Sequence, residues 1–268
     1  MSECNHNCSS CQSHCASYQE VLPTADTKIK NIIGVLSGKG GVGKSMVASL
    51  LAIELARKGY KVGLMDADIT GPSIAMMFGF QGELNGDESG IYPYESKLGI
   101  KTISINMMLE QEDDPVLWRG PILGGVIRQF YTEVHWGELD YLIVDMPPGT
   151  ADVAISVIND LPLKGLLMVT TPGKLVSMIV GKAVNMAKKA NVEVLGLIEN
   201  MAYISCPQCQ ENISIYKDDM TAEVAAKYDL ELLAKLPLDQ KLAQLADEGR
   251  IEEYDSQRLA AVVEKING

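Results

Sequence analysis

The fold is decided by the stretch Asn31-Ile32-Ile33-Gly34-Val35-Leu36-Ser37-Gly38-Lys39-Gly40-Gly41-Val42-Gly43-Lys44-Ser45. Residues 32–36 form a short apolar run, which is typical of a strand buried on both faces of a sheet. Residues 38–45 match the pattern G-x-x-x-x-G-K-[ST], and residues 46–58 carry strong helix formers up to the terminating Gly59. A buried strand, a glycine-rich turn and a helix in this order predict a P-loop, the cradle that binds the phosphates of a nucleoside triphosphate.

Nucleotide contacts are expected along the whole loop. Its glycines let backbone N–H groups converge on phosphate oxygens, because no Cβ stands in the way. Lys44 is expected to reach the β- and γ-phosphates of ATP, and the Ser45 hydroxyl is expected to bind Mg²⁺. The predicted nucleotide-binding residues of the loop are Gly38, Lys39, Gly40, Gly41, Val42, Gly43, Lys44, Ser45 and Met46.

Apolar runs and helical patterns alternate along the rest of the chain. The alternation predicts an α/β fold with a doubly wound, mostly parallel sheet flanked by helices, and with ligands at the carboxyl ends of the strands. Residues 80–105 are less regular and indicate an insertion or a short β-hairpin. Further strands are predicted at residues 60–65, 141–144, 165–170, 192–198 and 232–236, and helices at 121–135, 175–190, 221–228, 239–248 and 256–266.

The chain of 268 residues is acidic, with a formal net charge of −12. This charge argues against a general affinity for nucleic acid or for an anionic membrane surface, since both are negatively charged themselves. The chain lacks a run of about 20 apolar residues, so no transmembrane helix is expected. Its polar N-terminus does not have the pattern of a signal peptide, and we therefore expect a cytoplasmic protein.

Six cysteines fall into two clusters, and structural disulfides are rare in the cytoplasm. Cys206 and Cys209 form a C-x-x-C motif on a loop near residues 203–212. Two thiolates do not complete a tetrahedral metal site, but a symmetric dimer brings two pairs together, and both zinc and a 4Fe–4S cluster fit such a site. A thioredoxin-like redox motif is the other interpretation, although it needs a C-x-x-C at a helix N-terminus in a different fold.

The second cysteine cluster lies in residues 1–28, which are polar and show neither helical nor strand periodicity. We assign them to a Cys-rich metal-binding tail, and residues 29–268 to a P-loop ATPase domain. The spacing C-x3-C-x2-C-x3-C supplies enough ligands for one iron–sulfur cluster or one zinc ion within a single chain, and we expect the tail to fold only around its metal. The predicted ligands of the tail are Cys4, Cys8, Cys11 and Cys15.

With its additional lysine, Lys39, the loop resembles the deviant Walker A motif of the P-loop NTPase branch that includes MinD and the nitrogenase iron protein. In that branch the lysine reaches across a dimer interface to the partner's nucleotide, which implies that ATP binding and dimerisation are coupled. The motif Asp66-Ala67-Asp68 follows a predicted strand and resembles the first switch of the branch. By this resemblance Asp68 orients or deprotonates the attacking water, and Asp66 lies near Mg²⁺.

The motif Asp145-Met146-Pro147-Pro148-Gly149-Thr150 follows a later strand and resembles the second switch. The resemblance implies that Asp145 holds Mg²⁺ through water and that the Gly149 N–H donates to the γ-phosphate. Asn200 closes another predicted strand and resembles the residue that contacts adenine, since its amide both donates and accepts hydrogen bonds. The predicted catalytic residues are Lys39, Lys44, Asp68 and Asp145.

Together with residues 69–73 and 118–121, these motifs resemble the Mrp/ApbC family of iron–sulfur cluster carrier ATPases, and the resemblance extends over about residues 30–239. The resemblance implies that Cys206 and Cys209 hold a labile 4Fe–4S cluster shared across a homodimer. It also implies that slow ATP hydrolysis rearranges the dimer, and that the recipients are apo iron–sulfur proteins. The tail resembles that of the cytosolic scaffold members, although its cysteine spacing is shorter. Residues 170–174 depart from the family pattern, with Gly-Lys where relatives usually have glutamine and an acidic residue.

Two other functions are compatible with part of this motif set. A zinc-stabilised, MinD-like regulatory ATPase that cycles on membranes would need a basic amphipathic helix at its C-terminus. Residues 256–268 contain only two cations, Arg258 and Lys265. Electron transfer in the manner of the nitrogenase iron protein would need cysteines in the switch regions, and this sequence has none there.

Overall fold

A computed structural model describes the chain over residues 22–68, 73–108, 120–149, 152–173, 176–216, 219–255 and 257–268. The predicted tail ligands Cys4, Cys8, Cys11 and Cys15 lie outside these residues, as do residues 69–72, 118–119 and 150–151 of the predicted motifs. None of the helices in the described ranges has the length and apolar character that crossing a membrane requires.

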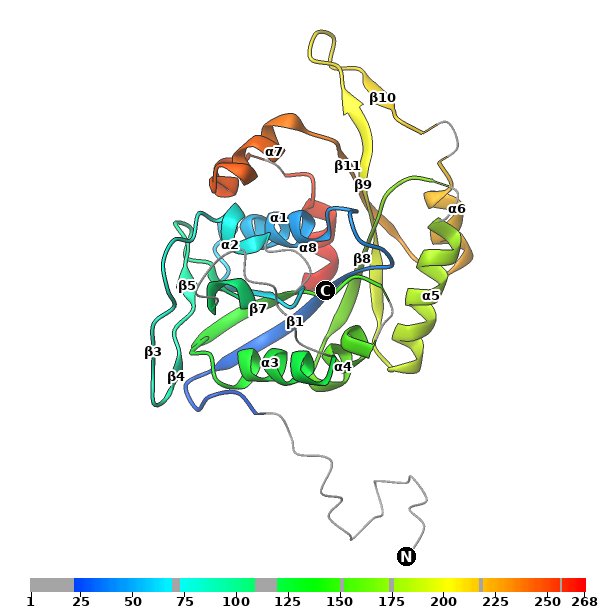
Figure 1. Ribbon diagram of the computed structural model, residues 1–268. Helices are drawn as coiled ribbons and strands as arrows, with labels where there is room; N and C mark the ends of the chain where they lie inside the picture. The colour runs from blue at the N-terminus through cyan, green and yellow to red at the C-terminus, as the bar shows by residue number, and fades with distance from the viewer. Residues whose placement is uncertain are drawn as a thin grey trace, which may run out of the picture.

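A nine-stranded sheet forms the centre of the molecule (Figure 1). Strand β1 (Lys28–Ser37) lies between β7 (Glu138–Asp145) and β8 (Gly165–Thr170) and is parallel to both. The strand order is β10-β9-β8-β1-β7-β2-β6-β5, with β11 also paired to β9, and β5 and β10 run antiparallel to their neighbours. The other strands of this sheet are β2 (Val62–Asp66), β5 (Tyr94–Glu95), β6 (Lys101–Ser104), β9 (Val194–Ser205), β10 (Asn212–Ser214) and β11 (Leu232–Pro237).

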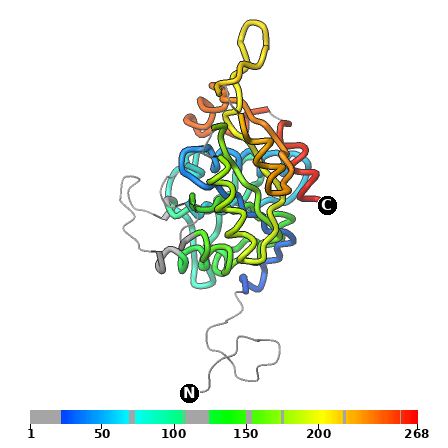
Figure 2. The backbone as a smooth tube through the Cα atoms, turned by 90° about the vertical axis from the view of Figure 1, so that its right-hand side faces the viewer, coloured from blue at the N-terminus to red at the C-terminus, as the bar shows by residue number. Residues whose placement is uncertain are grey.

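Helices cover both faces of the sheet (Figures 1 and 2), so the predicted doubly wound α/β fold is confirmed. The helices on one face are α1 (Lys44–Arg57), α2 (Ile74–Met77), α7 (Gln240–Asp247) and α8 (Ala260–Asn267). Those on the other face are α3 (Gly120–Thr132), α4 (Asp152–Asp160), α5 (Val176–Lys189) and α6 (Thr221–Lys227). Two 3₁₀ turns, η2 (Ile105–Met108) and η3 (Ile251–Glu253), and a separate hairpin of β3 (Gly86–Asp87) and β4 (Gly90–Ile91) complete the described elements.

Each face of the sheet buries its own apolar core, and β1 contributes to both. Successive side chains of a strand point to opposite faces. Ile33 and Val35 therefore pack in the core that contains α1 and α8, whereas Ile32 and Leu36 pack in the core that contains α3, α4 and α5. All four side chains are buried. The prediction that this run is a strand buried on both faces is confirmed.

Some elements differ from the sequence-based expectation. Strand β6, within the stretch expected to be an insertion or hairpin, is a parallel strand of the main sheet beside β2. Helix α4 follows the second acidic motif, where no helix was predicted. Strand β9 continues past residue 198 as far as Ser205 and pairs there with β10, which was not predicted either. Strand β1 begins at Lys28, the last residue assigned to the tail.

A substitution of Trp136 tests the core on the α3 face. The indole is fully buried, and its Nε1 donates a hydrogen bond to the Phe130 carbonyl oxygen at 2.9 Å. We expect Trp136→Ala to lower the free energy of unfolding in urea by about 3–5 kcal/mol, because it leaves a cavity. The control Leu98→Ala, at an exposed position, should change it by less than about 0.5 kcal/mol. Similar effects of the two substitutions would contradict the placement of Trp136.

Candidate nucleotide site and cysteine hairpin

The phosphate loop joins β1 to α1, and glycines determine its shape. Gly41 and Gly43 have φ angles of 76° and 75°, which residues with a side chain rarely adopt. Gly38 is needed for a different reason, since a Cβ there would lie 2.0 Å from Cγ2 of Ile179 on α5. Helix α1 begins at Lys44, earlier than the predicted start at residue 46, so its free N-terminal N–H groups lie at the loop itself.

Three acidic residues and one lysine meet beside this loop. Strands β2 and β7 are parallel neighbours, and their last residues, Asp66 and Asp145, are register partners. The Lys44 Nζ lies 2.5 Å from Oδ1 of Asp145 and 3.2 Å from Oδ2 of Asp68. The structure thus brings four predicted site residues together from three separate segments of the chain.

Burial leaves this cluster short of positive charge. Lys44, Asp66 and Asp145 are all buried. Loss of water raises the pKa of Asp66 well above its usual value, and the nearby Asp145 carboxylate raises it further. Burial also raises the pKa of Asp145, although the Lys44 ammonium works against this rise. One ammonium group faces three carboxyl groups, so an additional cation would stabilise the ionised form of the cluster.

Oxygen atoms suited to magnesium lie at the same place. Among the described residues, Oδ2 of Asp145 is buried and has no hydrogen-bond partner, and the Ser45 hydroxyl favours the ionised form of the Asp145 carboxylate by lowering its pKa. The Asp66 oxygens accept hydrogen bonds from the Asp68 backbone N–H and the Ser104 hydroxyl, both at 3.0 Å. Mg²⁺ usually takes one or two protein oxygens and completes its shell with water and phosphate oxygens. These residues fit that requirement.

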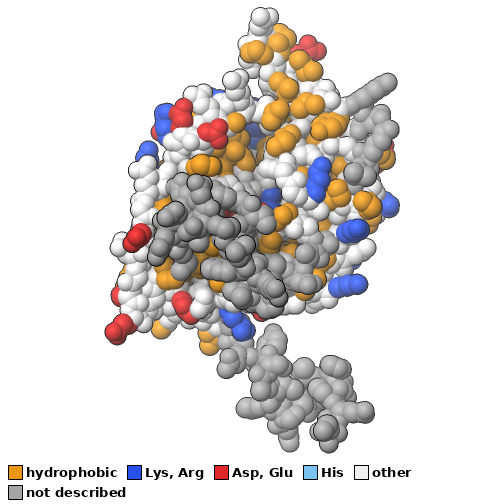
Figure 3. All heavy atoms as spheres, viewed as in Figure 1, with side chains coloured by type: hydrophobic (Ala, Val, Ile, Leu, Met, Phe, Trp, Pro, Cys, Tyr) orange, Lys and Arg blue, Asp and Glu red, His pale blue; other side chains and the backbone are white. Residues whose placement is uncertain are grey.

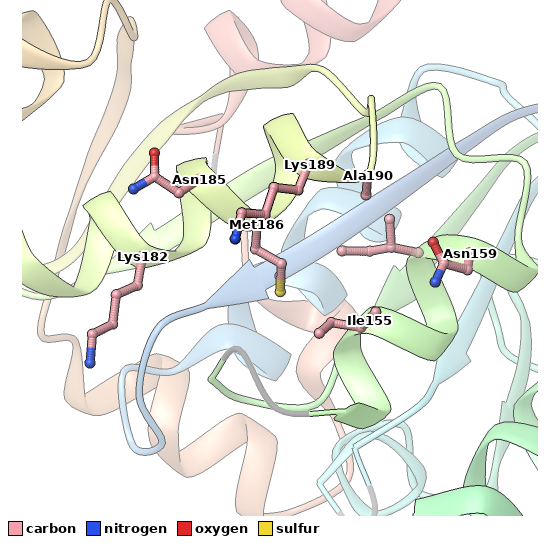
Figure 4. Close-up of a pocket in the computed structure, with 8 residues that line it drawn as sticks. Ile155, Asn159, Lys182, Asn185, Met186, Lys189 and Ala190 are labelled. Carbon is pink, nitrogen blue, oxygen red and sulfur yellow. The ribbon is translucent and has the colours of Figure 1, made fainter. Parts of the chain in front are cut away.

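A cavity of about 370 Å³ opens over the phosphate loop. The predicted residues that line it are Gly40, Gly41, Gly43, Lys44, Ser45, Met46 and Asp68. Lys39 is exposed and does not line the cavity of its own chain. Another cavity, of about 500 Å³, lies between α4 and α5, where Ile155, Lys182 and Met186 contribute to its wall (Figure 4), but it contains none of the predicted site residues.

The second acidic motif is tied to β1 by backbone hydrogen bonds. Gly149, with a φ of 87°, donates its N–H to the Ser37 carbonyl at 2.7 Å, and Met146 donates to the Val35 carbonyl at 3.0 Å. The predicted contact between the Gly149 N–H and a γ-phosphate therefore requires that this N–H first leave Ser37.

Asn200 lies against the phosphate loop and does not line the cavity. Its Nδ2 donates a hydrogen bond to the Val42 carbonyl at 2.9 Å. A Cβ on Gly43 would lie 2.3 Å from the same nitrogen, so this close approach requires glycine at position 43. In the structure Asn200 holds the loop from outside, and the contact with adenine that its resemblance implies stays a prediction.

Cys206 and Cys209 lie in the turn of a hairpin formed by β9 and β10, which projects from the body of the protein (Figures 1 and 2). The turn is closed by two hydrogen bonds of 2.9 Å, from the Cys206 N–H to the Glu211 carbonyl and from the Gln210 N–H to the Cys206 carbonyl. Both cysteines are free thiols. Hydrogen bonds from the backbone N–H groups of Cys209 and Gln208 lower the pKa of Cys206, which favours the thiolate that metals bind.

The hairpin presents two cysteine thiols and an apolar surface. Across the described residues, no three His, Cys, Asp or Glu side chains are grouped so that they could hold a metal ion. Apolar side chains gather on the projecting part of the molecule in Figure 3. The exposed ones in and beside the hairpin are Ile204, Ile213, Ile215 and Tyr216.

Ser104, whose hydroxyl donates to Asp66, is a residue of the site that the sequence did not predict. Ser104 ends β6, and the four residues of that strand are Lys-Thr-Ile-Ser. Because a single apolar residue does not make an apolar run, no local signal marked this strand or the serine at its end.

A phosphate loop and a cysteine pair in one chain are consistent with the family and the relatives to which this chain is similar. Residues 28–267 match the ParA family model described as NUBPL iron-transfer P-loop NTPase. The iron–sulfur cluster carrier protein of Clostridium perfringens is 47% identical over 241 residues, which cover 87% of this chain and 84% of the relative. The protein of the same name from Methanocaldococcus jannaschii is 39% identical over 287 residues, covering 100% of this chain and 99% of the relative.

Solved structures agree with this result. A nucleotide-binding protein from Archaeoglobus fulgidus, in complex with ADP, is 42% identical and superposes with a TM-score of 0.77, covering 85% of this chain and 90% of its own. The cell division protein MinD of Aquifex aeolicus is 17% identical with a TM-score of 0.59, covering 88% of this chain and 95% of its own. The latter likeness shows the fold alone.

The raised pKa of Asp66 leads to a prediction about stability. A folded state that raises a carboxyl pKa binds the proton more tightly than the unfolded chain does. Ionised Asp66 therefore opposes folding, and this penalty grows as the pH rises from the ordinary aspartate pKa of about 4 toward the raised folded value. We expect Asp66→Asn to increase the free energy of unfolding of nucleotide-free protein by about 1–3 kcal/mol at pH 8, and by less at pH 5.

The matched control is Asp140→Asn, on the neighbouring strand β7. There the Lys30 ammonium and the Lys61 N–H lower the pKa of the carboxyl. The same substitution should therefore decrease stability at pH 8. Urea denaturation at both pH values, in buffer without magnesium, measures the two effects. A lower free energy of unfolding in Asp66→Asn would show that the ionised Asp66 carboxylate does not destabilise the folded state.

Proposed function

The chain belongs to the NUBPL family of iron-transfer P-loop NTPases, and from this membership we propose that Cys206 and Cys209 carry a 4Fe–4S cluster. Two copies of the chain share the cluster and hand it to apo iron–sulfur proteins. ATP binding and hydrolysis at the phosphate loop drive the cycle of loading and release. The cluster is cargo in this scheme, and the nucleotide is the fuel.

The cysteine pair in the turn of the projecting hairpin, with Cys206 half-buried and Cys209 exposed, is the observation that carries this proposal. A 4Fe–4S cluster takes four thiolates, and the described part of one chain offers two at the hairpin. A two-fold axis through the hairpin turn would bring the same pair from a second copy and complete the set. A cluster held at such an exposed position is accessible to a recipient protein.

The apolar side chains of the hairpin support a symmetric contact. Ile204, Ile213 and Ile215 are exposed in the single chain although they are large and apolar. Burial of such side chains against their copies would stabilise a dimer, at roughly 25 cal/mol for each Å² removed from water. The cluster then lies at the interface between the two hairpins, and its bonds to the cysteines of both copies stabilise that interface.

The phosphate loop supplies the ATPase chemistry. Lys44 exchanges its carboxylate partners for the β- and γ-phosphates, and Asp68, once released, orients or deprotonates the attacking water. Ser45 and Asp145, with Asp66 nearby, would hold Mg²⁺, which neutralises charge on the phosphates when bound. Lys39, exposed and outside its own cavity, is free to reach the nucleotide of the partner.

We also propose roles for the remaining predicted residues. The Gly149 N–H moves from the Ser37 carbonyl to the γ-phosphate, which links the second acidic motif to the presence of ATP. The tail cysteines, Cys4, Cys8, Cys11 and Cys15, hold a second metal centre, either an iron–sulfur cluster or zinc. The relative from Drosophila virilis, 42% identical over 226 residues, is named a cytosolic Fe–S cluster assembly factor, and we place this chain in the cytoplasm as well.

Removal of the hairpin thiols tests the cargo site. After anaerobic reconstitution with iron and sulfide, we expect the parent to gain a dimer with four additional irons shared between its hairpins. The variant Cys206→Ser/Cys209→Ser should lose those irons, the dimer that depends on them and the ability to activate an apo-enzyme. Iron analysis, Mössbauer spectra and sedimentation measure these outcomes.

The matched controls separate the hairpin from the tail. Ser214→Ala in β10 should retain cluster and dimer, and a variant with all four tail cysteines changed to serine should retain the shared cluster. Transfer by the hairpin variant at the parental rate would refute the proposal. One firmly bound zinc per chain at the hairpin would instead indicate a structural metal.

Asp68→Asn tests the ATPase proposal. The substitution removes the predicted base, so the rate of ATP hydrolysis in a single turnover should fall by about 10²-fold or more. Because Asp68 also competes with phosphate for Lys44, the Kd for ATP should not increase. The control Glu83→Gln, at an exposed position, should hydrolyse ATP normally. An unchanged hydrolysis rate in Asp68→Asn would exclude Asp68 from the reaction.

A further inference from the structure

Strand β9 consists of two parts: both pair with β11, but only the first pairs with β8 and only the second pairs with β10. Residues 194–199 pair with β8 and β11 inside the parallel sheet, and the pairing with β8 ends at Glu199. Residues 203–205 pair with β10 and lead directly into Cys206. The first part belongs to the body of the protein, and the second part belongs to the hairpin that carries the cysteines.

The two parts are joined by an irregular segment, residues 200–202. On β11, Lys235 is opposite Glu199 and Pro237 is opposite Tyr203, so β9 uses more residues than β11 to cover the same length of sheet. Met201, in this segment, has a φ of 55°, which is strained for a residue with a side chain. Such bulges redirect a strand, and they are frequent next to functional sites.

The irregular segment is also the part of β9 that touches the phosphate loop. Asn200 donates to the Val42 carbonyl at 2.9 Å, as described above. Around Gly43, the atoms that a Cβ would meet are those of Asn200 and the Cε of Met201, the latter at 3.5 Å. The two residues therefore pack against the loop immediately before Lys44.

Fixed contacts hold β9 on either side of this segment. Below it, buried Glu199 is bound by Lys235 on β11 at 2.8 Å and by the Thr221 hydroxyl of α6. Above it, the Tyr203 carbonyl accepts the Leu238 N–H at 2.8 Å. Between these two fixed points, Asn200 and Met201 are the residues that contact the phosphate loop.

We propose that Asn200 and Met201 are positioning residues that couple the phosphate loop to the cysteine hairpin. A change in the loop when nucleotide binds alters the hydrogen bond between Val42 and Asn200. The bend at Met201 passes this change to the part of β9 that ends at Cys206. By thermodynamic linkage, the state of the hairpin then alters nucleotide affinity to the same extent. This inference rests on the proposed function, and it names the residues that connect the nucleotide site to the cluster site.

The test uses the full chain without its cluster, so that it does not depend on cluster binding. The rate at which iodoacetamide alkylates the hairpin thiols, followed by mass spectrometry of the Cys206–Cys209 peptide, is measured with and without Mg-ADP. We expect ADP to change this rate at least threefold in the parent. In Met201→Gly, glycine accepts the positive φ without strain and leaves the segment flexible, so ADP should still bind but change the rate less than 1.5-fold.

Two further variants identify the contact and the control. Asn200→Asp has the same shape but cannot donate to the Val42 carbonyl, and it should lose the ADP effect as well. Asn191→Gly relieves a φ of 56° in the turn after α5, away from the segment, and should keep the full effect. The proposal is overturned if ADP leaves the parental rate unchanged, or if Met201→Gly responds as the parent does. Failure of cluster reconstitution would count against the proposed function only.

Discussion

The structure depends on the buried Lys44 ammonium group, which forms ion pairs with the carboxylates of Asp145 and Asp68. Lys44 starts α1, Asp145 ends β7 and Asp68 follows β2, so its two ion pairs join three segments at the carboxyl edge of the sheet. Each partner stabilises the others only while the set is complete, since an unpaired charge in this place is costly. A phosphate that bound Lys44 would therefore remove an ion-pair partner from both acidic motifs at once.

Strand β9 connects the phosphate loop to the cysteine hairpin. It is the strand that both contacts the phosphate loop, through Asn200, and leaves the body of the protein to carry Cys206. The acidic motifs and the hairpin lie on opposite sides of the loop in the strand order, with β2 and β7 on one side of β1 and β8 and β9 on the other. Because β1 lies at the centre of the sheet, the phosphate loop that follows it is adjacent both to the acidic motifs and to β9.

Much of this arrangement could be predicted from the sequence, because its signals are local. The phosphate loop, the two aspartate motifs and the C-x-x-C each occupy a few consecutive residues, and strand–helix alternation places them at one edge of a sheet. Helix α4 was missed although Ala154, Val157, Ile158 and Leu161, all buried, have helical spacing. The preceding Pro147-Pro148-Gly149 is typical of a loop, and the residues after it were therefore interpreted as part of the loop motif. The bond between Asn200 and Val42 spans 158 positions, and no local pattern reports such a contact.

The position of the cysteine pair in the hairpin turn has a consequence for the chain when it carries no cluster. Cys206 has a lowered pKa, and the thiol of Cys209 lies three residues further along the turn of the projecting hairpin. A thiolate that is accessible to a partner is equally accessible to peroxide, which converts it to a sulfenic acid that the second thiol condenses into a disulfide. The thiols of the unloaded carrier are thus sensitive to peroxide, and reducing power in its compartment determines how much of it remains able to bind a cluster.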